Sequence, residues 1–460
     1  LQTGLDEAAW IVSGYLLAYG IAMTFMGRMS DIIGRRQVFL IALVIFGIGS
    51  YLVAVADTWP ARGVLRAAAW LTDGRPDPAL VALWTLVGAR MVQAFGGGAM
   101  VPVGMALVGD LYPAGQRAAP LGVIAAVDTA GWVVGHLYGG ILTRYFDWRL
   151  IFWLNLPICL LALALIARAL VGLPRPAPCG KMDWLGALLI AGSLALLNIG
   201  LGGSGNVETS LAVTGGASTG GRAGTWAYLL AAGIGLVLFV FRQQRTRFPL
   251  MPLAMFRRAG FAPASLANFL LGISLFVAIA NVPLFINTLV AQSLEQGAWD
   301  SGWMLSALTV PMALATVPGG WLASRWGYRT PALAGLAGAL VGFMLMAGWQ
   351  RETPYLAMAL HLSLTGIGFG LTMAPIAAAV INAAPGEDRG TASAQVIIFR
   401  LVGMTLGVSG MAAYGVWRAD VLSNQWLSNG ADLMYTVEIG LRVAERVVQE
   451  SFWIAGGVIF

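Results

Sequence analysis

The sequence predicts an all-α membrane protein built from two related bundles of helices, and three observations support this prediction. The chain is 58% hydrophobic and 10% charged, whereas soluble domains carry about 25% charged residues. Its long apolar segments contain the roughly 20 residues that cross a hydrocarbon core of about 30 Å. A short basic turn between two apolar segments occurs at residues 27–36 and is echoed at 320–329, which is typical of an internal duplication.

The apolar segments predict thirteen membrane spans along the chain. They lie near 9–26, 38–56, 80–109, 119–142, 150–170, 184–202, 225–242, 262–290, 302–324, 331–349, 355–381, 391–416 and from 452 onward. Trp184, Trp226 and Trp349 lie at or near span ends, where amphipathic rings favour the membrane interface. The last span is expected to be incomplete. The direction of the first predicts one further helix upstream, so we expect fourteen spans in the intact protein.

The arginines orient these spans. Most of those close to span ends fall in one set of loops, including the turns at 28–36 and 325–329. Cytoplasmic loops carry an excess of such residues, so we assign this set to the cytoplasm. The net charge of +6 is therefore interpreted as membrane topology. It does not indicate nucleic-acid binding, and we expect a multi-pass protein of the cytoplasmic (inner) membrane.

Three regions follow from the duplication. Residues 1–171 are expected to form an N-terminal bundle that lacks its first span, and residues 261–460 a C-terminal bundle. Between them, residues 172–260 hold two inserted spans with flanking loops. The outer segment 417–451 has apolar residues at helical spacing, with charged pairs opposite. It is either a solvated extension of the last span or a surface that receives an apolar substrate or partner.

Several function classes are excluded by residues that the chain lacks. Lys181 is its single lysine, and no Gly-rich phosphate loop precedes it, so energy from ATP is not expected. The two cysteines, Cys159 and Cys179, suggest neither a disulfide framework nor a metal site. With two histidines in total, no membrane-face cluster suits an enzyme that acts on lipids. We expect no cofactor and no metal.

Five ionisable residues lie deep in predicted spans, namely Arg90, Asp128, His136, His361 and Arg400. Each costs about 2.5–3.5 kcal/mol at the bilayer centre on insertion scales unless it is paired or hydrated. Asp128 is the acid among them and is the best candidate for a proton carrier. Arg90 in the same bundle, or Arg400 at the equivalent position of the other half, could supply its counter-charge. The alternative is a permanent structural ion pair.

The span that contains Asp128 carries further candidates. Trp132 and His136 follow at helical spacing on the same face. His136 is a candidate proton relay, since histidine titrates near neutral pH, and a packing histidine is the alternative. His361 is assigned to packing. Small residues serve close packing between membrane helices. The candidates for such packing here are Gly131, Gly135, Gly139 and Gly140.

The first basic turn is a candidate conformational latch. Asp31 and Arg35 are one helical turn apart, and glycine at position 34 permits a chain reversal. A topology signal with a helix cap is the alternative. The residues of this proposed latch are Gly27, Asp31, Gly34, Arg35 and Arg36. In the second turn Ser324 replaces the acid.

The bundles contain few charges and many Met, Phe, Trp and small residues, which favours a lipophilic or weakly cationic substrate. Candidates for the substrate cavity are Gln93, Trp132, Asn268, Asn281 and Asn287. For the asparagines, hydrogen bonding within the bundle is the alternative.

These motifs resemble the major facilitator superfamily, specifically its fourteen-span drug:proton antiporter branch. The turn at 27–36, the segment Arg90 to Gly98, and the glycines at 131–140 are similar to the family's motifs in spans two to five. One departure is Gly135-His136, where the antiporter motif has Gly-Pro. The Trp10 to Val12 run and the Arg400 to Gly407 segment are most similar to a mycobacterial subgroup that exports lipids.

The resemblance implies a secondary transporter that exports lipophilic small molecules by proton antiport, as in multidrug efflux. The alternatives are a lipid exporter for triacylglyceride-like or glycolipid-like molecules and an uncoupled facilitator. The partners it implies are the lipophilic or lipid substrate, protons, membrane lipids and a periplasmic or lipoprotein partner. Nucleic acid and an enzymatic activity are not expected.

Overall fold

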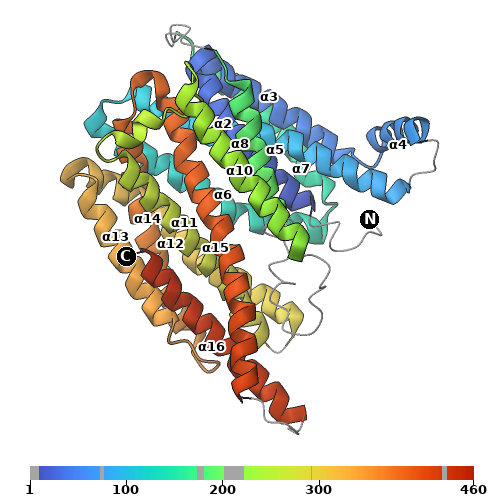
Figure 1. Cartoon of the computed structure of the whole chain (residues 1–460), viewed down its shortest axis with the longest axis vertical. Helices are drawn as coiled ribbons and strands as arrows, with labels where there is room; N and C mark the ends of the chain where they lie inside the picture. The colour runs from blue at the N-terminus through green and yellow to red at the C-terminus, as the bar shows by residue number, and fades with distance from the viewer. Residues whose placement is uncertain are drawn as a thin grey trace.

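The structure is a computed structural model that describes residues 10–72, 77–172, 181–200, 222–291, 293–426 and 433–459. Across these residues the long elements are α-helices, which form two bundles that meet along one side and diverge away from it (Figure 1). This confirms the predicted all-α membrane fold. Ten helices are long and apolar enough to span a membrane among the residues described.

The N-terminal bundle begins with α2 (Trp10–Ile33) and α3 (Arg35–Ala54), which join at Gly34. Gly34 has a φ of 107°, a left-handed conformation that glycine adopts without steric cost. The bundle continues with α5 (Pro78–Leu111), α6 (Ala118–Tyr145) and α7 (Arg149–Ala169). The two inserted helices, α8 (Trp184–Gly200) and α10 (Arg222–Arg245), pack against each other beside α2.

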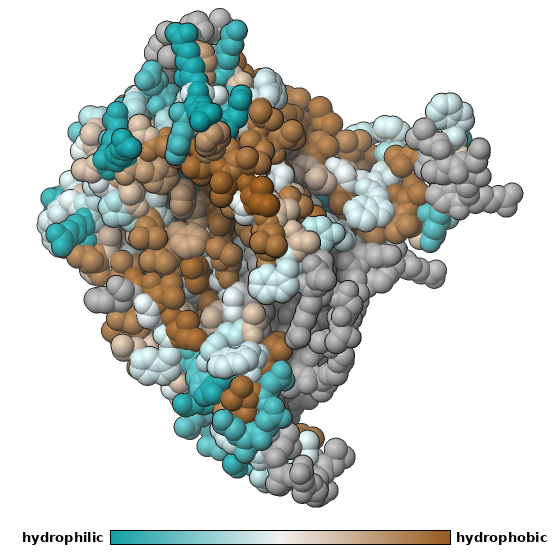
Figure 2. Space-filling view, in the orientation of Figure 1, coloured by the Kyte–Doolittle hydropathy of each residue, from teal (hydrophilic) through white to brown (hydrophobic). Residues whose placement is uncertain are grey.

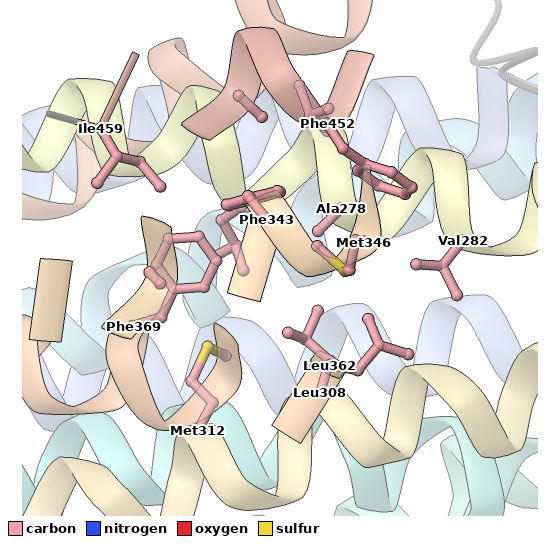
Figure 3. Close-up of a cluster of buried hydrophobic side chains, with 14 of the residues drawn as sticks. Ala278, Val282, Leu308, Met312, Phe343, Met346, Leu362, Phe369, Phe452 and Ile459 are labelled. Atoms are coloured by element: carbon pink, nitrogen blue, oxygen red, sulfur yellow. The ribbon is translucent and has the colours of Figure 1, made fainter. Parts of the chain in front are cut away.

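The C-terminal bundle consists of the helices from α11 onward. They are α11 (Phe261–Phe285) with the π-helical turn η3 (Ile286–Val290), α12 (Leu294–Trp326), α13 (Arg329–Met346), α14 (Tyr355–Ala383), α15 (Arg389–Trp426) and α16 (Leu433–Ile459). Its core is a cluster in which the ring of Phe343 packs against those of Phe369 and Phe452, and Met312 belongs to the same cluster (Figure 3). Short 3-10 turns precede α6, α11 and α15; they are η1 (Ala114–Gln116), η2 (Leu253–Arg257) and η4 (Gly386–Asp388).

Each of the thirteen predicted spans corresponds to one of these helices, but the structure adds an element between α3 and α5. The helix α4 (Trp59–Thr72) lies outside the bundle (Figure 1). Its short, Arg-containing sequence does not reach a span length, so hydropathy alone gave no signal for it.

The outer segment 417–451 is in part an extension of the last span, since α16 runs from Leu433 into that span. The structure divides it between the end of α15 and the start of α16, which form a hairpin at the foot of the molecule (Figure 1). Leu422 of α15 packs on Ile439, Val443 and Val447 of α16. Because α15 lies against it, α16 buries Ile439, Val443 and Val447, whereas Val437, another apolar residue of this segment, is exposed.

The surface reflects the membrane setting. Hydrophobic side chains cover the middle of the molecule, and hydrophilic ones gather at its upper end and at the foot formed by α15 and α16 (Figure 2). The upper end carries the basic turn at 27–36, which the arginine distribution assigns to the cytoplasm.

The bundles touch along two seams, α2 against α15 and α6 against α12. Both seams are tight because glycine lets the backbones approach. A Cβ on Gly27 would lie 2.8 Å from the carbonyl oxygen of Gly390, and one on Gly122 would lie 2.8 Å from that of Thr316. Small residues thus set the spacing between the bundles.

Candidate functional site: the interface between the bundles

An ion pair joins the two bundles within the predicted spans. The Nη2 group of Arg400 on α15 donates a hydrogen bond to Oδ2 of Asp128 on α6 over 3.3 Å. The side chains are 16% and 23% exposed, respectively. Arg400 Nη1 also lies 3.7 Å from the Met373 sulfur on α14. Residues at equivalent positions of the two halves therefore meet across the interface that separates the halves.

Two tyrosines on α2 extend this site, and the sequence prediction missed them. Tyr15 and Tyr19 stack with ring centroids 5.9 Å apart. Tyr19 lies within electrostatic reach of both Asp128 and Arg400. Tyr15 carries the Arg90 guanidinium over its ring at 4.5 Å. The two tyrosines lie one helical turn apart (i,i+4) on the span that leads into the latch, and this spacing is the feature of the sequence that could have identified them.

Arg90 does not contact Asp128 in this structure. Its Nη1 group donates to Gln93 Oε1 over 2.7 Å, and Gln93 in turn donates to the Ser50 hydroxyl over 2.8 Å. Arg90 therefore belongs to a polar chain inside the N-terminal bundle. The sequence left Arg90 and Arg400 as alternative partners of Asp128, and in the structure Arg400 pairs with it.

The predicted latch lies at the end of the seam between α2 and α15 that the arginine distribution predicts to be cytoplasmic. Asp31 Oδ1 accepts hydrogen bonds from Arg35 Nη1 (2.5 Å) and the Gly390 N–H (2.8 Å). Asp31 Oδ2 accepts two more, each 2.9 Å, from the N–H and hydroxyl of Thr391. A carboxylate at a helix N-terminus satisfies free N–H groups and interacts favourably with the helix dipole. Asp31 of one bundle thus caps α15 of the other.

Further charges surround this cap. Arg28 pairs with Asp388 at 2.8 Å, again between bundles. Asp110 at the end of α5 accepts from Arg35 at 2.9 Å and from Arg389 at 3.0 Å. Sequence reasoning missed Asp110 and Asp388, since acids at helix ends usually face solvent. Arg36 behaves differently from the other latch candidates and donates to the Ala167 carbonyl of its own bundle over 3.0 Å.

The seam between α6 and α12 also has polar contacts at this end, but they do not involve a carboxylate. Tyr328, in the turn between α12 and α13, donates its hydroxyl to the Ala114 carbonyl over 3.2 Å. Asn382 at the end of α14 donates to the same carbonyl over 3.1 Å and accepts from Arg117 Nη1 over 2.5 Å. Among the pairs whose two residues the structure describes, every hydrogen bond between the bundles lies at these cytoplasmic ends or at Asp128.

The close packing predicted for the glycines of α6 is not seen at Gly131 and Gly135 among the described residues. Both are exposed, and no described atom lies within 4 Å of a Cβ built on either. The physical reason is that no described helix lies against this face of α6. Their counterparts Gly403 and Gly407 on α15 do pack closely, against Phe269 and Ile273 of α11.

The substrate candidates whose side chains the structure describes make hydrogen bonds within their own bundles. Gln93, Asn268 and Asn281 are buried. Asn268 donates to the Val396 carbonyl, and Asn281 donates to that of Val277 over 2.9 Å. Asn287 accepts from Ser301 over 3.1 Å. These contacts favour the alternative of hydrogen bonding within the bundle. The side chains of Trp132, His136 and Gly140 lie outside the described residues.

Two helical bundles that meet at a buried charge pair and at a polar cytoplasmic seam define a membrane transporter of the two-bundle class. The sequence matches the family model described as Major Facilitator Superfamily over residues 1–257 and 264–423. The chain belongs to this superfamily. It is a multi-pass membrane transporter, not an enzyme.

Curated relatives with similar sequences are named as triacylglyceride transporters. The one from Mycobacterium tuberculosis is 30% identical over 472 residues, which cover 99% of this chain and 84% of that protein. The one from Mycobacteroides abscessus is 30% identical over 430 residues, covering 90% and 75% respectively. Among solved structures, the proton:xylose symporter XylE has a TM-score of 0.57 at 16% identity, covering 97% of this chain and 84% of that chain. It supports the fold alone.

Proposed function

We propose that this transporter exports a lipid-like, lipophilic substrate of the triacylglyceride kind across the cytoplasmic membrane in exchange for protons. The observation that carries the coupling is the Asp128–Arg400 pair, because it holds together two bundles that must move apart. The names of the relatives support a lipid in preference to a drug. Multidrug efflux and uncoupled transport are outcomes that the test below separates.

The proposed cycle trades the charge of Asp128 against Arg400. With Asp128 ionised, the pair favours the arrangement seen here, in which the Asp31 cap closes the cytoplasmic end. A proton from the outer side neutralises Asp128, and Arg400 loses its partner. Losing one partner of a buried pair costs about 3–5 kcal/mol, which is enough to shift a two-state equilibrium by more than 100-fold.

The protonated protein then opens to the cytoplasm, where Asp128 releases its proton and substrate enters from the inner leaflet. Re-formation of the pair closes the cytoplasmic end around the substrate. Since the cap on α15 and the ion pair lie on the same helix, one movement of α15 makes or breaks both.

The experiment is transport by the protein reconstituted into liposomes, with a fluorescent triacylglyceride and a cationic dye as probes, with and without an imposed pH gradient. We expect gradient-dependent triacylglyceride movement that Asp128→Asn abolishes while lipid binding persists. Dye transport without triacylglyceride transport would favour multidrug efflux. Triacylglyceride transport that ignores the gradient and survives Asp128→Asn would overturn proton coupling.

A further inference from the structure

A cavity of about 390 Å³ lies in the outer half of the N-terminal bundle, among α2, α3, α5 and α7. Its lining residues are Ile11, Val53, Ala56, Asp57, Ala82, Leu86, Arg90, Trp148, Arg149 and Phe152. The volume falls in the range of about 300–1,000 Å³ that is typical of small-molecule sites. Apart from three charged side chains, this lining is apolar.

The charges of the cavity do not balance. Arg149 pairs with Asp57, the carboxylate of the lining, and at 3.1 Å with Asp147, which lies outside the lining. Arg90 lies deeper and has no carboxylate within salt-bridge distance among the described residues. Its Nε atom is buried and has no hydrogen-bond partner among the described residues. The lining itself holds two arginines and one carboxylate, Asp57, so it carries one positive charge in excess.

The surroundings of Arg90 compensate this charge only in part. The guanidinium lies over the ring of Tyr15 at 4.5 Å and near that of Phe152 at 5.4 Å. Such contacts contribute about 0.5–2 kcal/mol, whereas a buried charge without a counter-ion costs several kcal/mol. An anion that enters this cavity would remove that cost.

We propose that the cavity binds an amphipathic carboxylate, such as a fatty acid, independently of the transport site at Asp128. The planar guanidinium matches a carboxylate in geometry and charge. An alkyl chain attached to that carboxylate would lie along Leu86, Val53 and Phe152 toward the outer surface. The unpartnered Arg90 Nε and the apolar walls select for both parts of this ligand.

The test uses the full-length protein in phosphatidylcholine nanodiscs with a photoreactive dodecanoate, and cross-links are mapped by mass spectrometry. We expect saturable labelling of α5 and α7 peptides that dodecanoate competes for and dodecanol does not. Arg90→Gln should weaken competition by dodecanoate roughly 10- to 100-fold, as expected for one charged hydrogen bond. Leu86→Trp, which fills the cavity and keeps Arg90, should also abolish the labelling.

Arg442→Gln is the matched control, because Arg442 is exposed on the outer hairpin and pairs with Glu438 on its own helix. This variant should label like the unaltered protein. If dodecanol competed for labelling as well as dodecanoate does in the unaltered protein, the proposal would be overturned. Labelling outside α5 and α7, or labelling that Leu86→Trp leaves unchanged, would also overturn it.

Discussion

At the scale of single residues, the arrangement of Asp128 and Arg400 makes their charges interdependent. Each side chain is mostly buried, and the two come from different bundles. In an environment of low dielectric, a lone charge left behind by its partner costs more than the pair contributes. A variant that removes one charge should therefore lose much more stability at this interface than a variant that exchanges the two charges.

We predict that Asp128→Arg and Arg400→Asp, made singly, each abolish proton-driven transport. Each places two like charges 3–4 Å apart, which costs several kcal/mol. The double exchange restores an opposite pair, so it should recover cytoplasmic closure and part of the transport. Initial transport rates of the three variants form the measurement. If the double exchange is no better than the single ones, the two residues do not act as a pair.

Sequence reasoning identified this pair because the duplication set positions 128 and 400 at equivalent places in the two halves. It could not choose between Arg90 and Arg400, since contacts between bundles are not visible in a linear sequence. It also missed Tyr15 and Tyr19, because tyrosine in a membrane helix is common and carries no charge to mark it.

At the scale of elements, the start of α15 is held by a side chain from another bundle. Asp31 accepts three hydrogen bonds from Gly390 and Thr391, two of them from backbone N–H groups. A helix terminus that is capped by a moving neighbour opens when the neighbour departs. The stability of this helix terminus therefore depends on whether α2 and α15 are in contact.

We predict that Asp31→Asn raises hydrogen exchange in the peptide at residues 389–395 about tenfold or more. The amide keeps an acceptor but loses the charge, and a hydrogen bond to a charged group contributes about 1.5–3 kcal/mol against about 0.5–1.5 kcal/mol for a neutral one. Asp77→Asn is the control, because Asp77 caps α5 by accepting from Ala79 within its own bundle. Unchanged exchange at 389–395 in Asp31→Asn would exclude the latch.

The hairpin of α15 and α16 depends on pH through Glu450. Hydrogen bonds from Arg418 and Tyr414 lower the pKa of Glu450 from 4.5 to about 2. A carboxyl group whose pKa is depressed in the folded state stabilises that state above its unfolded pKa. This contribution is complete above about pH 4.5 and is lost as the pH falls toward 2.

We predict that hydrogen exchange at residues 438–450 increases as the pH is lowered from 5 to 3, after correction for the intrinsic rate. Glu450→Gln should raise exchange at neutral pH and remove this pH dependence, since one charge-assisted pair contributes roughly 1–3 kcal/mol. Glu438→Gln is the control, since Glu438 is exposed and pairs with Arg442 within α16. A hairpin that responds equally to both substitutions would contradict the role of Glu450.

Elements were predictable where hydropathy alone decides them, and so every predicted span has its helix. The helix α4 was missed because a short amphipathic helix lacks a long apolar run. The hairpin within segment 417–451 was missed because a helical pattern of apolar residues does not show which other helix packs against it. The close packing expected at Gly131 and Gly135 depended on a neighbouring helix, which a glycine pattern does not specify.

At the scale of the whole molecule, the described contacts between bundles gather on one side. The two seams, with their close glycine contacts and polar caps, lie toward the end predicted to be cytoplasmic. Of the polar contacts between the bundles, the Asp128–Arg400 pair lies deepest in the predicted spans. Movement about that pair would leave the core around Phe343 largely intact, since its buried members all belong to the C-terminal bundle, whereas it would part the cluster around Met23 and Ile381, which takes side chains from both bundles.

The most direct test is the distance between spin labels on the cytoplasmic ends of the two bundles as a function of pH. Leu111→Cys on α5 and Trp326→Cys on α12 are suitable sites, because both side chains are exposed. The labels are placed in protein whose Cys159 and Cys179 are replaced by serine. Protonation of Asp128 should release Arg400 and lengthen this distance as the pH is lowered.

We expect Asp128→Asn, which mimics the protonated acid, to show the longer distance at every pH. A distance in the unaltered protein that ignores pH, or a pH-dependent change that Asp128→Asn leaves intact, would contradict the exchange of charge between Asp128 and Arg400.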